Sequence, residues 1–158
     1  MSTVISNRYA LRPLGPTDLD IVVRHRHRMF VDAGKPDDDG LAGKSDAFRD
    51  WLIPRLADGR YYGWLALAGK EVAAGLGMMT VDWPPHPLHL EAARGYILNV
   101  YTEPAHRRQG LARLLTTRAL DEARQRDLHV LFLHATEQGR YVYEQAGFRS
   151  INEMQLHL

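Results

Sequence analysis

Residues 95–134 constrain the fold of this chain most strongly. The apolar run over 95–103 predicts a strand, Gly110–Arg126 predicts a helix, and the β-rich run His129–His134 predicts a second strand. One face of the expected helix carries its apolar residues, which are Leu111, Leu114, Leu115, Ala119 and Ala123. A strand, a helix and a strand in this order predict a right-handed crossover between two parallel strands.

The rest of the chain is expected to add strands and helices on both sides of this unit. Before this unit, the expected elements are a strand at 7–12 ended by Pro13, a helix from Thr17 to Gly34, a loop at 35–44, and a helix capped by Ser45 and kinked or shortened by Pro54. Strands at 61–68 and 72–81 follow, joined by a turn at Gly69 and Lys70, and then a stiff loop at 82–92. After the unit, we expect a helix at 138–146 closed by Gly147 and a last strand at 151–158. The order β-α-α-β-β-β-α-β-α-β predicts a three-layer α/β (α+β) fold with a mixed central sheet flanked by helices.

Length and cysteine usage limit the chemistry. A chain of 158 residues predicts a single domain over 1–158. It contains no cysteine, so a disulfide framework, a Cys-ligated metal site and a thiol nucleophile are all excluded. Any group transfer must therefore use another nucleophile or pass directly from donor to acceptor.

The charge balance argues against several partners. There are 20 basic and 19 acidic residues, a net charge of +1, which is unlike the strongly basic field of most nucleic-acid binders. No apolar run approaches the roughly 18 residues that a membrane span needs, and the first residues lack the apolar core of a secretory signal. No His pair has further ligands at convincing spacing for a metal. The expected protein is cytoplasmic, with no metal, nucleic-acid or membrane partner.

Residues 107–112, read Arg-Arg-Gln-Gly-Leu-Ala, follow the predicted strand and begin the predicted helix. The first amides of a helix have no internal partner, and the helix dipole places partial positive charge there. Gly110 and Ala112 are small enough for a ligand to approach the main chain, and Arg107 and Arg108 add charge at the rim. These features predict an anion site suited to a diphosphate. Neither a P-loop nor a G-x-G-x-x-G fingerprint is present.

Two motifs make the chain resemble the GCN5-related N-acetyltransferase (GNAT) family. Residues 107–112 match that family's Q/R-x-x-G-x-G/A loop between a strand and a helix. Residues 143–148, read Tyr-Glu-Gln-Ala-Gly-Phe, match its Y-x-x-x-G-F run at the end of the last helix. The resemblance extends over nearly the whole chain in element order and in size.

The resemblance implies an acetyl-CoA-dependent N-acetyltransferase that acetylates a primary amine directly. By the resemblance, the main chain of Val100, Tyr101 and Thr102 would pair with the pantetheine. The loop residues would hold the pyrophosphate, with the amides of Arg108, Gln109, Gly110, Leu111, Ala112 and Arg113 facing it and Arg107 beside them. Tyr143 would protonate the departing thiolate. Residues 136–138 depart from the family pattern, which often has Asn there.

Several assignments stay open on sequence alone. The general base is Glu91, Glu103, His134, Glu137 or a water molecule, because a transferring amine must lose a proton. The acceptor is a small molecule, an amino acid, or an amine of a peptide or protein, and a homodimer is possible. The alternatives are a non-catalytic acyl-CoA-binding or regulatory module on the same fold and a nucleic-acid binder.

Two charged segments also have open interpretations. The basic run 24–28 is either a solvated helix face or, with the loop 35–44, the border of an acceptor site that recognises an acidic group. The three aspartates at 37–39 either attract a basic acceptor or are solvated.

Overall fold

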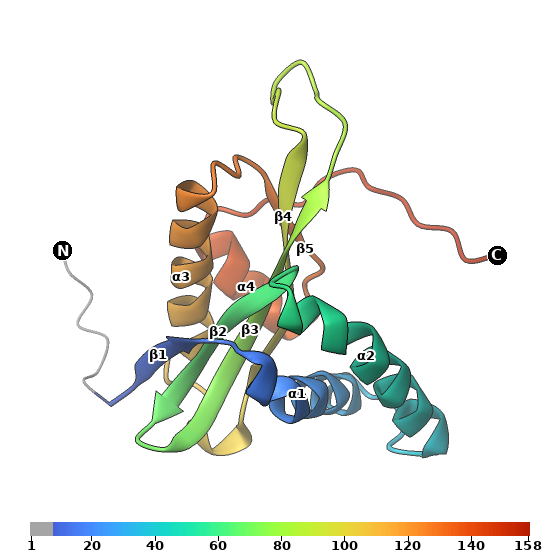
Figure 1. The fold of residues 1–158 in the computed structure, drawn as a ribbon, viewed down its shortest axis with the longest axis vertical. Helices are drawn as coiled ribbons and strands as arrows, with labels where there is room; N and C mark the ends of the chain where they lie inside the picture. The colour runs from blue at the N-terminus through green and yellow to red at the C-terminus, as the bar shows by residue number, and fades with distance from the viewer. Residues whose placement is uncertain (1–7) are drawn as a thin grey trace.

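The computed structural model describes residues 8–158 and contains a five-stranded sheet in the order β1-β2-β3-β4-β5 (Figure 1). The strands are β1 (Ala10–Pro13), β2 (Tyr61–Ala68), β3 (Glu71–Asp82), β4 (Ala93–Thr102) and β5 (Leu131–Leu133). The first four pair antiparallel, whereas β4 and β5 pair parallel. This confirms the mixed sheet and the parallel crossover predicted from residues 95–134.

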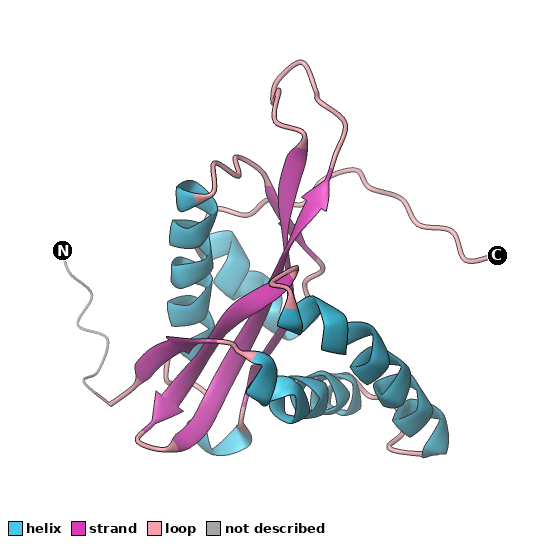
Figure 2. Ribbon diagram, viewed as in Figure 1, coloured by secondary structure: helices cyan, strands magenta, loops and turns pink. Residues whose placement is uncertain are grey.

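Four helices cover the two faces of the sheet (Figure 2). They are α1 (Leu19–Asp32), α2 (Asp39–Ala57), α3 (Leu111–Gln125) and α4 (Glu137–Gln145), and the short 3-10 turns η1 (Pro16–Asp18) and η2 (Pro104–His106) precede α1 and α3. The helices α1 and α2 pack on one face, and α3 packs on the other with α4 beside it. The predicted three-layer fold is confirmed. Within residues 8–158, no helix has the length and apolar character needed to span a membrane.

The apolar core lies in two clusters, one on each side of the sheet. On the α3 side, Leu111, Leu115 and Ala119 are buried against Met78 and Ile97 of the central strands. The predicted apolar stripe of this helix is therefore its sheet-facing side. On the other side, a second cluster joins α1 and α2 to the sheet; its buried members are Val22, Val23, Leu52, Leu56 and Tyr61. Both clusters position the elements that surround the central strand β4.

A β-bulge in β4 changes the direction of its side chains. The register with β3 shifts so that Leu76 alone lies opposite both Asn99 and Val100. Asn99 has a positive φ of 54° and is buried. Strict alternation would send Leu98 and Asn99 to opposite faces. Here Leu98 packs on the α1–α2 cluster and Asn99 bonds to Arg26 of α1, so both lie on that face.

The second helix begins earlier than expected. The loop prediction is right for 35–38 but wrong for 39–44, and the cap at Ser45 is wrong, because α2 begins at Asp39. The side chain of Asp38 caps it by accepting a hydrogen bond from the Leu41 amide at 3.0 Å. The helix then continues past Pro54 to Ala57 and is not shortened there. A run of aspartates followed by glycine looks like a loop, yet an Asp N-cap is among the strongest helix starts.

The chain ends differ from the prediction as well. The expected last strand at 151–158 is wrong, since these residues have no regular structure and their alternating apolar side chains are exposed. Alternation makes a segment able to pair, but a strand also needs a free neighbouring edge in register. β5 is also shorter than predicted, and β1 includes Pro13, which the prediction placed beyond its end. Residue 7 of the expected first strand lies outside the described residues.

Candidate functional site

Among residues 8–158, no strand pairs with one edge of β4 over half its length. Pairing with β5 stops at Ile97 opposite Leu133, while β4 continues to Thr102. The main chain of Val100, Tyr101 and Thr102 therefore borders the gap between the two strands. An extended ligand can add to such an edge by main-chain hydrogen bonds. The structure thus places these three predicted residues together on one free strand edge.

The start of α3 adjoins the end of β4 through the short turn η2. Gly110 is the N-cap residue with a left-handed φ of 78°, and no side chain caps the helix. By contrast, Asp38 caps α2 and the Thr136 hydroxyl caps α4. The first amides of α3, at Leu111, Ala112 and Arg113, are therefore not satisfied by a capping side chain. Amides without such a partner are able to bind an anion, which is the role that the loop sequence predicts for them.

The two loop arginines differ in their surroundings. Arg107 forms an ion pair with Asp32 of α1, and its Nε donates to the Thr102 carbonyl at 3.1 Å. The guanidinium of Arg107, which the sequence places at the rim of the loop, is therefore directed to α1 and has an acidic partner there. Arg108 is exposed and has a positive φ of 61°. Gln109 and Arg113 are exposed as well.

Tyr143 lies on α4 and is half-buried. Its ring makes an edge contact with Phe148, with 6.0 Å between ring centroids. Burial raises the pKa of the Tyr143 phenol to about 12. A phenol with this pKa stays protonated at neutral pH and is able to donate a proton.

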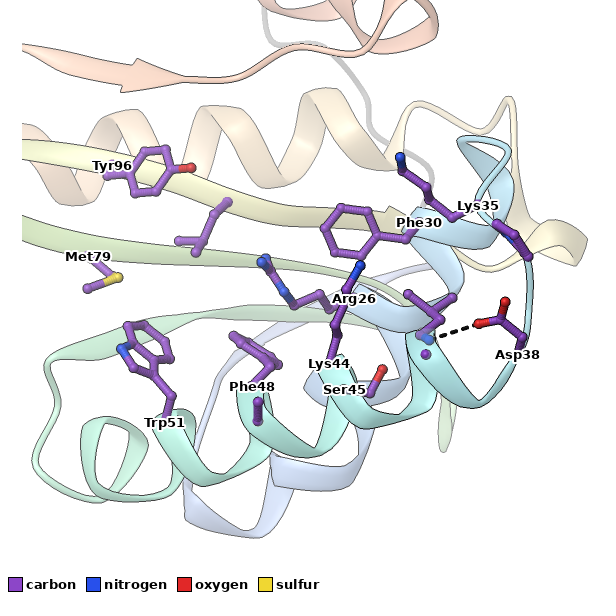
Figure 3. Close-up of a pocket in the computed structure, with 15 residues that line it drawn as sticks. Arg26, Phe30, Lys35, Asp38, Lys44, Ser45, Phe48, Trp51, Met79 and Tyr96 are labelled. Atoms are coloured by element: carbon purple, nitrogen blue, oxygen red, sulfur yellow. Dashed lines mark hydrogen bonds between the residues drawn. The ribbon is translucent and has the colours of Figure 1, made fainter. Parts of the chain in front are cut away.

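A cavity of about 1010 Å³ lies between α1, α2 and the sheet (Figure 3). Its volume is at the upper end of the range for small-molecule sites. Aromatic and aliphatic side chains form much of its wall; they are Phe30, Leu41, Phe48, Trp51, Met79, Tyr96 and Leu98. Its cationic side chains are Arg26, Lys35 and Lys44. The run 24–28 and the segment 35–44 therefore each contribute residues to one cavity.

Arg26 is held at this cavity by several contacts. Its NH1 group donates to the Asn99 side-chain oxygen at 2.7 Å. Its guanidinium lies 5.0 Å from the ring centroid of Phe30 and 4.6 Å from that of Phe48. Asn99 in turn donates to the Tyr61 hydroxyl at 2.8 Å. The bulge of β4 and the cavity wall are thus joined by one hydrogen-bonded chain.

Of the four candidate bases, one contacts the cavity wall. The Nδ1 atom of His134 lies 3.1 Å from the Tyr96 hydroxyl oxygen, which is within hydrogen-bond distance. The other three have different neighbours. Glu91 is 3.5 Å from His129, and Glu103 pairs with Arg24 and the buried His25. The side chain of Glu137 is 3.7 Å from Arg140 and is 92% exposed. Burial lowers the pKa of His25, against the opposing effect of Glu103.

Two of the three aspartates have structural partners. Asp38 caps α2, and Asp37 lies 2.8 Å from the His27 Nε2. Within residues 8–158, no group of three or more His, Asp or Glu side chains is arranged to hold a metal ion.

Sequence reasoning did not single out Arg26 or Tyr96. Arg26 stands within a run of alternating Arg and His, where no residue differs visibly from its neighbours. Phe30, four residues later, places an aromatic ring on the same helix face and is the one available signal. Tyr96 is indistinguishable from the other residues of a strong strand. The pocket wall is assembled from segments far apart in the chain.

Comparison with known proteins agrees with this geometry. The family model described as the acetyltransferase (GNAT) family matches residues 22–148. A GCN5-related N-acetyltransferase from Ralstonia eutropha JMP134 is 46% identical, with a TM-score of 0.90 over 95% of this chain and 98% of that chain. A predicted acetyltransferase from Clostridium acetobutylicum, solved with acetyl-CoA, is 29% identical, with a TM-score of 0.84 over 95% of each chain. Comparison with curated proteins finds no match.

The matched range contains most of α1, the free edge of β4, the start of α3 and Tyr143 of α4. With the mixed sheet and the uncapped helix start, the sequence motifs and the similar structures lead to one assignment. The chain belongs to the acetyltransferase (GNAT) family.

Proposed function

We propose that this protein transfers an acetyl group from acetyl-CoA directly to a primary amine. The observation that carries the proposal is the free edge of β4 beside the uncapped start of α3. An extended chain ending in a diphosphate is complementary to this arrangement, because a strand edge pairs with amides and a helix start binds phosphate. The whole chain acts as a single domain in this proposal.

The donor binds along Val100, Tyr101 and Thr102 and at the loop 107–113. Its diphosphate accepts hydrogen bonds from the amides of Arg108 to Arg113. Arg107 supports the loop from α1 through Asp32, so its side chain positions the site. The Clostridium acetobutylicum structure, solved with acetyl-CoA, supports the choice of donor.

The acceptor amine attacks the thioester carbonyl carbon, and the bond between that carbon and sulfur breaks. Tyr143 donates its proton to the departing thiolate, since burial keeps its phenol neutral. His134 takes the proton of the amine through the Tyr96 hydroxyl or a water molecule, because among the four base candidates it contacts a residue of the cavity wall. No covalent enzyme intermediate is needed, as befits a chain without cysteine.

The test is a transfer assay with acetyl-CoA and a panel of primary amines that spans amino acids, small aromatic and aliphatic amines, and peptides. The proposal predicts free CoA and acetylated amine in equal amounts for at least one member. Binding of acetyl-CoA without transfer to any amine would instead support the non-catalytic acyl-CoA-binding module.

A further inference from the structure

Arg26 is a half-buried cation for which residues 8–158 provide no carboxylate partner. Nine other arginines and five histidines of this part of the chain form ion pairs, but Arg26 forms none. Its polar contact is the neutral side chain of Asn99 at 2.7 Å. Burial lowers its pKa, and no nearby carboxylate opposes that effect. A guanidinium in such a place is complementary to an anion that arrives from outside.

The cavity around Arg26 combines aromatic and cationic side chains. Phe30 and Phe48 lie against its guanidinium, and Trp51 stacks on Phe48 with 5.7 Å between centroids (Figure 3). The cationic residues Lys35 and Lys44 also line the cavity. The one carboxylate in the wall, Asp38, is bonded to the Leu41 amide as the cap of α2. The cavity therefore favours a ligand with a negative group and an apolar body.

The position of Arg26 relates this preference to the reaction. Its partner Asn99 is the bulge residue of β4, and the next residue, Val100, begins the free edge proposed for the donor. A carboxylate bound to Arg26 therefore holds the rest of the acceptor close to the expected acetyl group. An amine only a few bonds from that carboxylate is within reach of it.

We propose, given the proposed function, that the acceptor is an amine that also bears a carboxylate and an apolar body. Arg26 binds the carboxylate, and Phe48 and Trp51 contact the apolar body. The simplest members of this class are amino acids with aromatic or large aliphatic side chains. Arg26 is the residue that determines this specificity.

The test compares three acceptors that share an aromatic ring and an amine: phenylalanine, phenylalaninamide and 2-phenylethylamine. Only the first carries the carboxylate. A charge-assisted hydrogen bond predicts kcat/KM at least about tenfold higher for phenylalanine. Equal or higher kcat/KM for either analogue that lacks the carboxylate would overturn the proposal.

Variants separate recognition from a merely structural role. Arg26→Gln removes the charge and is expected to bring the ratio of phenylalanine to phenylalaninamide close to one. Arg26→Lys keeps the charge and restores part of the ratio. Arg28→Gln, an exposed arginine of the same helix that does not line the cavity, is the control and leaves the ratio unchanged. A structural role would lower kcat/KM for all three acceptors equally, and that result would also overturn the proposal.

A binding measurement keeps the test independent of turnover. The amine-free probes 3-phenylpropanoate and 3-phenylpropanamide are titrated against the protein, with tryptophan fluorescence as the readout. The acid is expected to bind more tightly than the amide, and Arg26→Gln abolishes the difference. If the acid binds in this way but no amine is acetylated, the transferase proposal fails while the anion site stands. If the acid does not bind more tightly than the amide, the inference fails whether or not transfer occurs.

Discussion

At the residue scale, the environment of Tyr143 suits it to act as an acid. Its ring is half-buried against Phe148, and burial raises the pKa of its phenol to about 12. An acid works in its protonated form, so a raised pKa extends its working range upward in pH. We therefore expect the proposed contribution of Tyr143 to be complete at neutral pH and lost only as pH rises toward its pKa of about 12.

Tyr143→Phe removes this proton and retains the ring. We expect kcat to fall about 10²-fold, with the Kd for acetyl-CoA unchanged. The matched control is Tyr141→Phe on the same helix, where the side chain is 69% exposed. Steady-state rates between pH 7 and 10 measure both variants. A Tyr143→Phe enzyme with the wild-type rate throughout this range would remove the acid role.

The candidate site residues that could be found from the sequence are those that lie in short motifs of neighbouring residues. Gly110 and Tyr143 lie in short motifs with a fixed relation to a helix end, so pattern alone finds them. Arg26 and Tyr96 have roles set by residues 22 to 73 positions away, as in the contacts of Arg26 with Phe48 and Asn99. Apart from Phe30, four residues after Arg26, no local pattern indicates these contacts.

At the scale of elements, the start of α3 is the feature most sensitive to substitution. Gly110 has a φ of 78°, and a Cβ at this position would meet no other atom within 4 Å. A side chain would therefore cost backbone strain of about 1–2 kcal/mol without a clash inside the protein. Its methyl group would stand where the diphosphate of the donor is proposed to approach.

Gly110→Ala is therefore expected to weaken acetyl-CoA binding by about tenfold or more, equivalent to roughly 1.4 kcal/mol. Gly59→Ala is the matched control, because Gly59 has a similar φ of 80° and equally open surroundings but follows α2. Both variants lose similar stability, whereas only Gly110→Ala changes the Kd measured by calorimetry. Equal Kd values for the two variants would contradict the assignment of the anion site.

The predicted elements were right where pattern and packing agree. The apolar face of α3 packs on the apolar residues of the central strands, and both elements were predicted from their sequence patterns. The start of α2 was missed because one aspartate, Asp38, turns an acidic segment into a helix cap. The tail at 151–158 was wrongly predicted as a strand, because alternation does not say whether an edge is available. The bulge at Asn99 leaves no trace in composition.

At the scale of the whole molecule, the sheet separates two apolar clusters and joins the edge of β4 proposed for the donor to the cavity proposed for the acceptor. Tyr61 lies in the cluster on the α1–α2 side, is 1% exposed, and accepts a hydrogen bond from Asn99. Burial raises its pKa above the ordinary value. In the unfolded chain a tyrosine ionises near pH 10. The stabilisation from a neutral Tyr61 is therefore complete below about pH 10 and is lost as pH rises above it.

The free energy of unfolding is accordingly expected to fall by about 1 kcal/mol per fully buried tyrosine between pH 8 and 11. Urea denaturation at the two pH values measures the change. Tyr61→Phe lowers the free energy of unfolding at pH 8, but it reduces the further decrease in that free energy between pH 8 and pH 11. Tyr141→Phe, on the exposed side of α4, leaves that loss unaltered. A Tyr61→Phe protein with the full wild-type loss would show that Tyr61 does not carry this dependence.

The most direct measurement is a crystal structure of the protein with acetyl-CoA. We expect a diphosphate bonded to the amides of residues 108–113 and a pantetheine paired with the edge of β4 at Val100 to Thr102. We also expect the sulfur within hydrogen-bond distance of the Tyr143 hydroxyl, with the acetyl group directed toward the cavity beside Arg26. A donor bound elsewhere, or a diphosphate away from the start of α3, would contradict the proposed function.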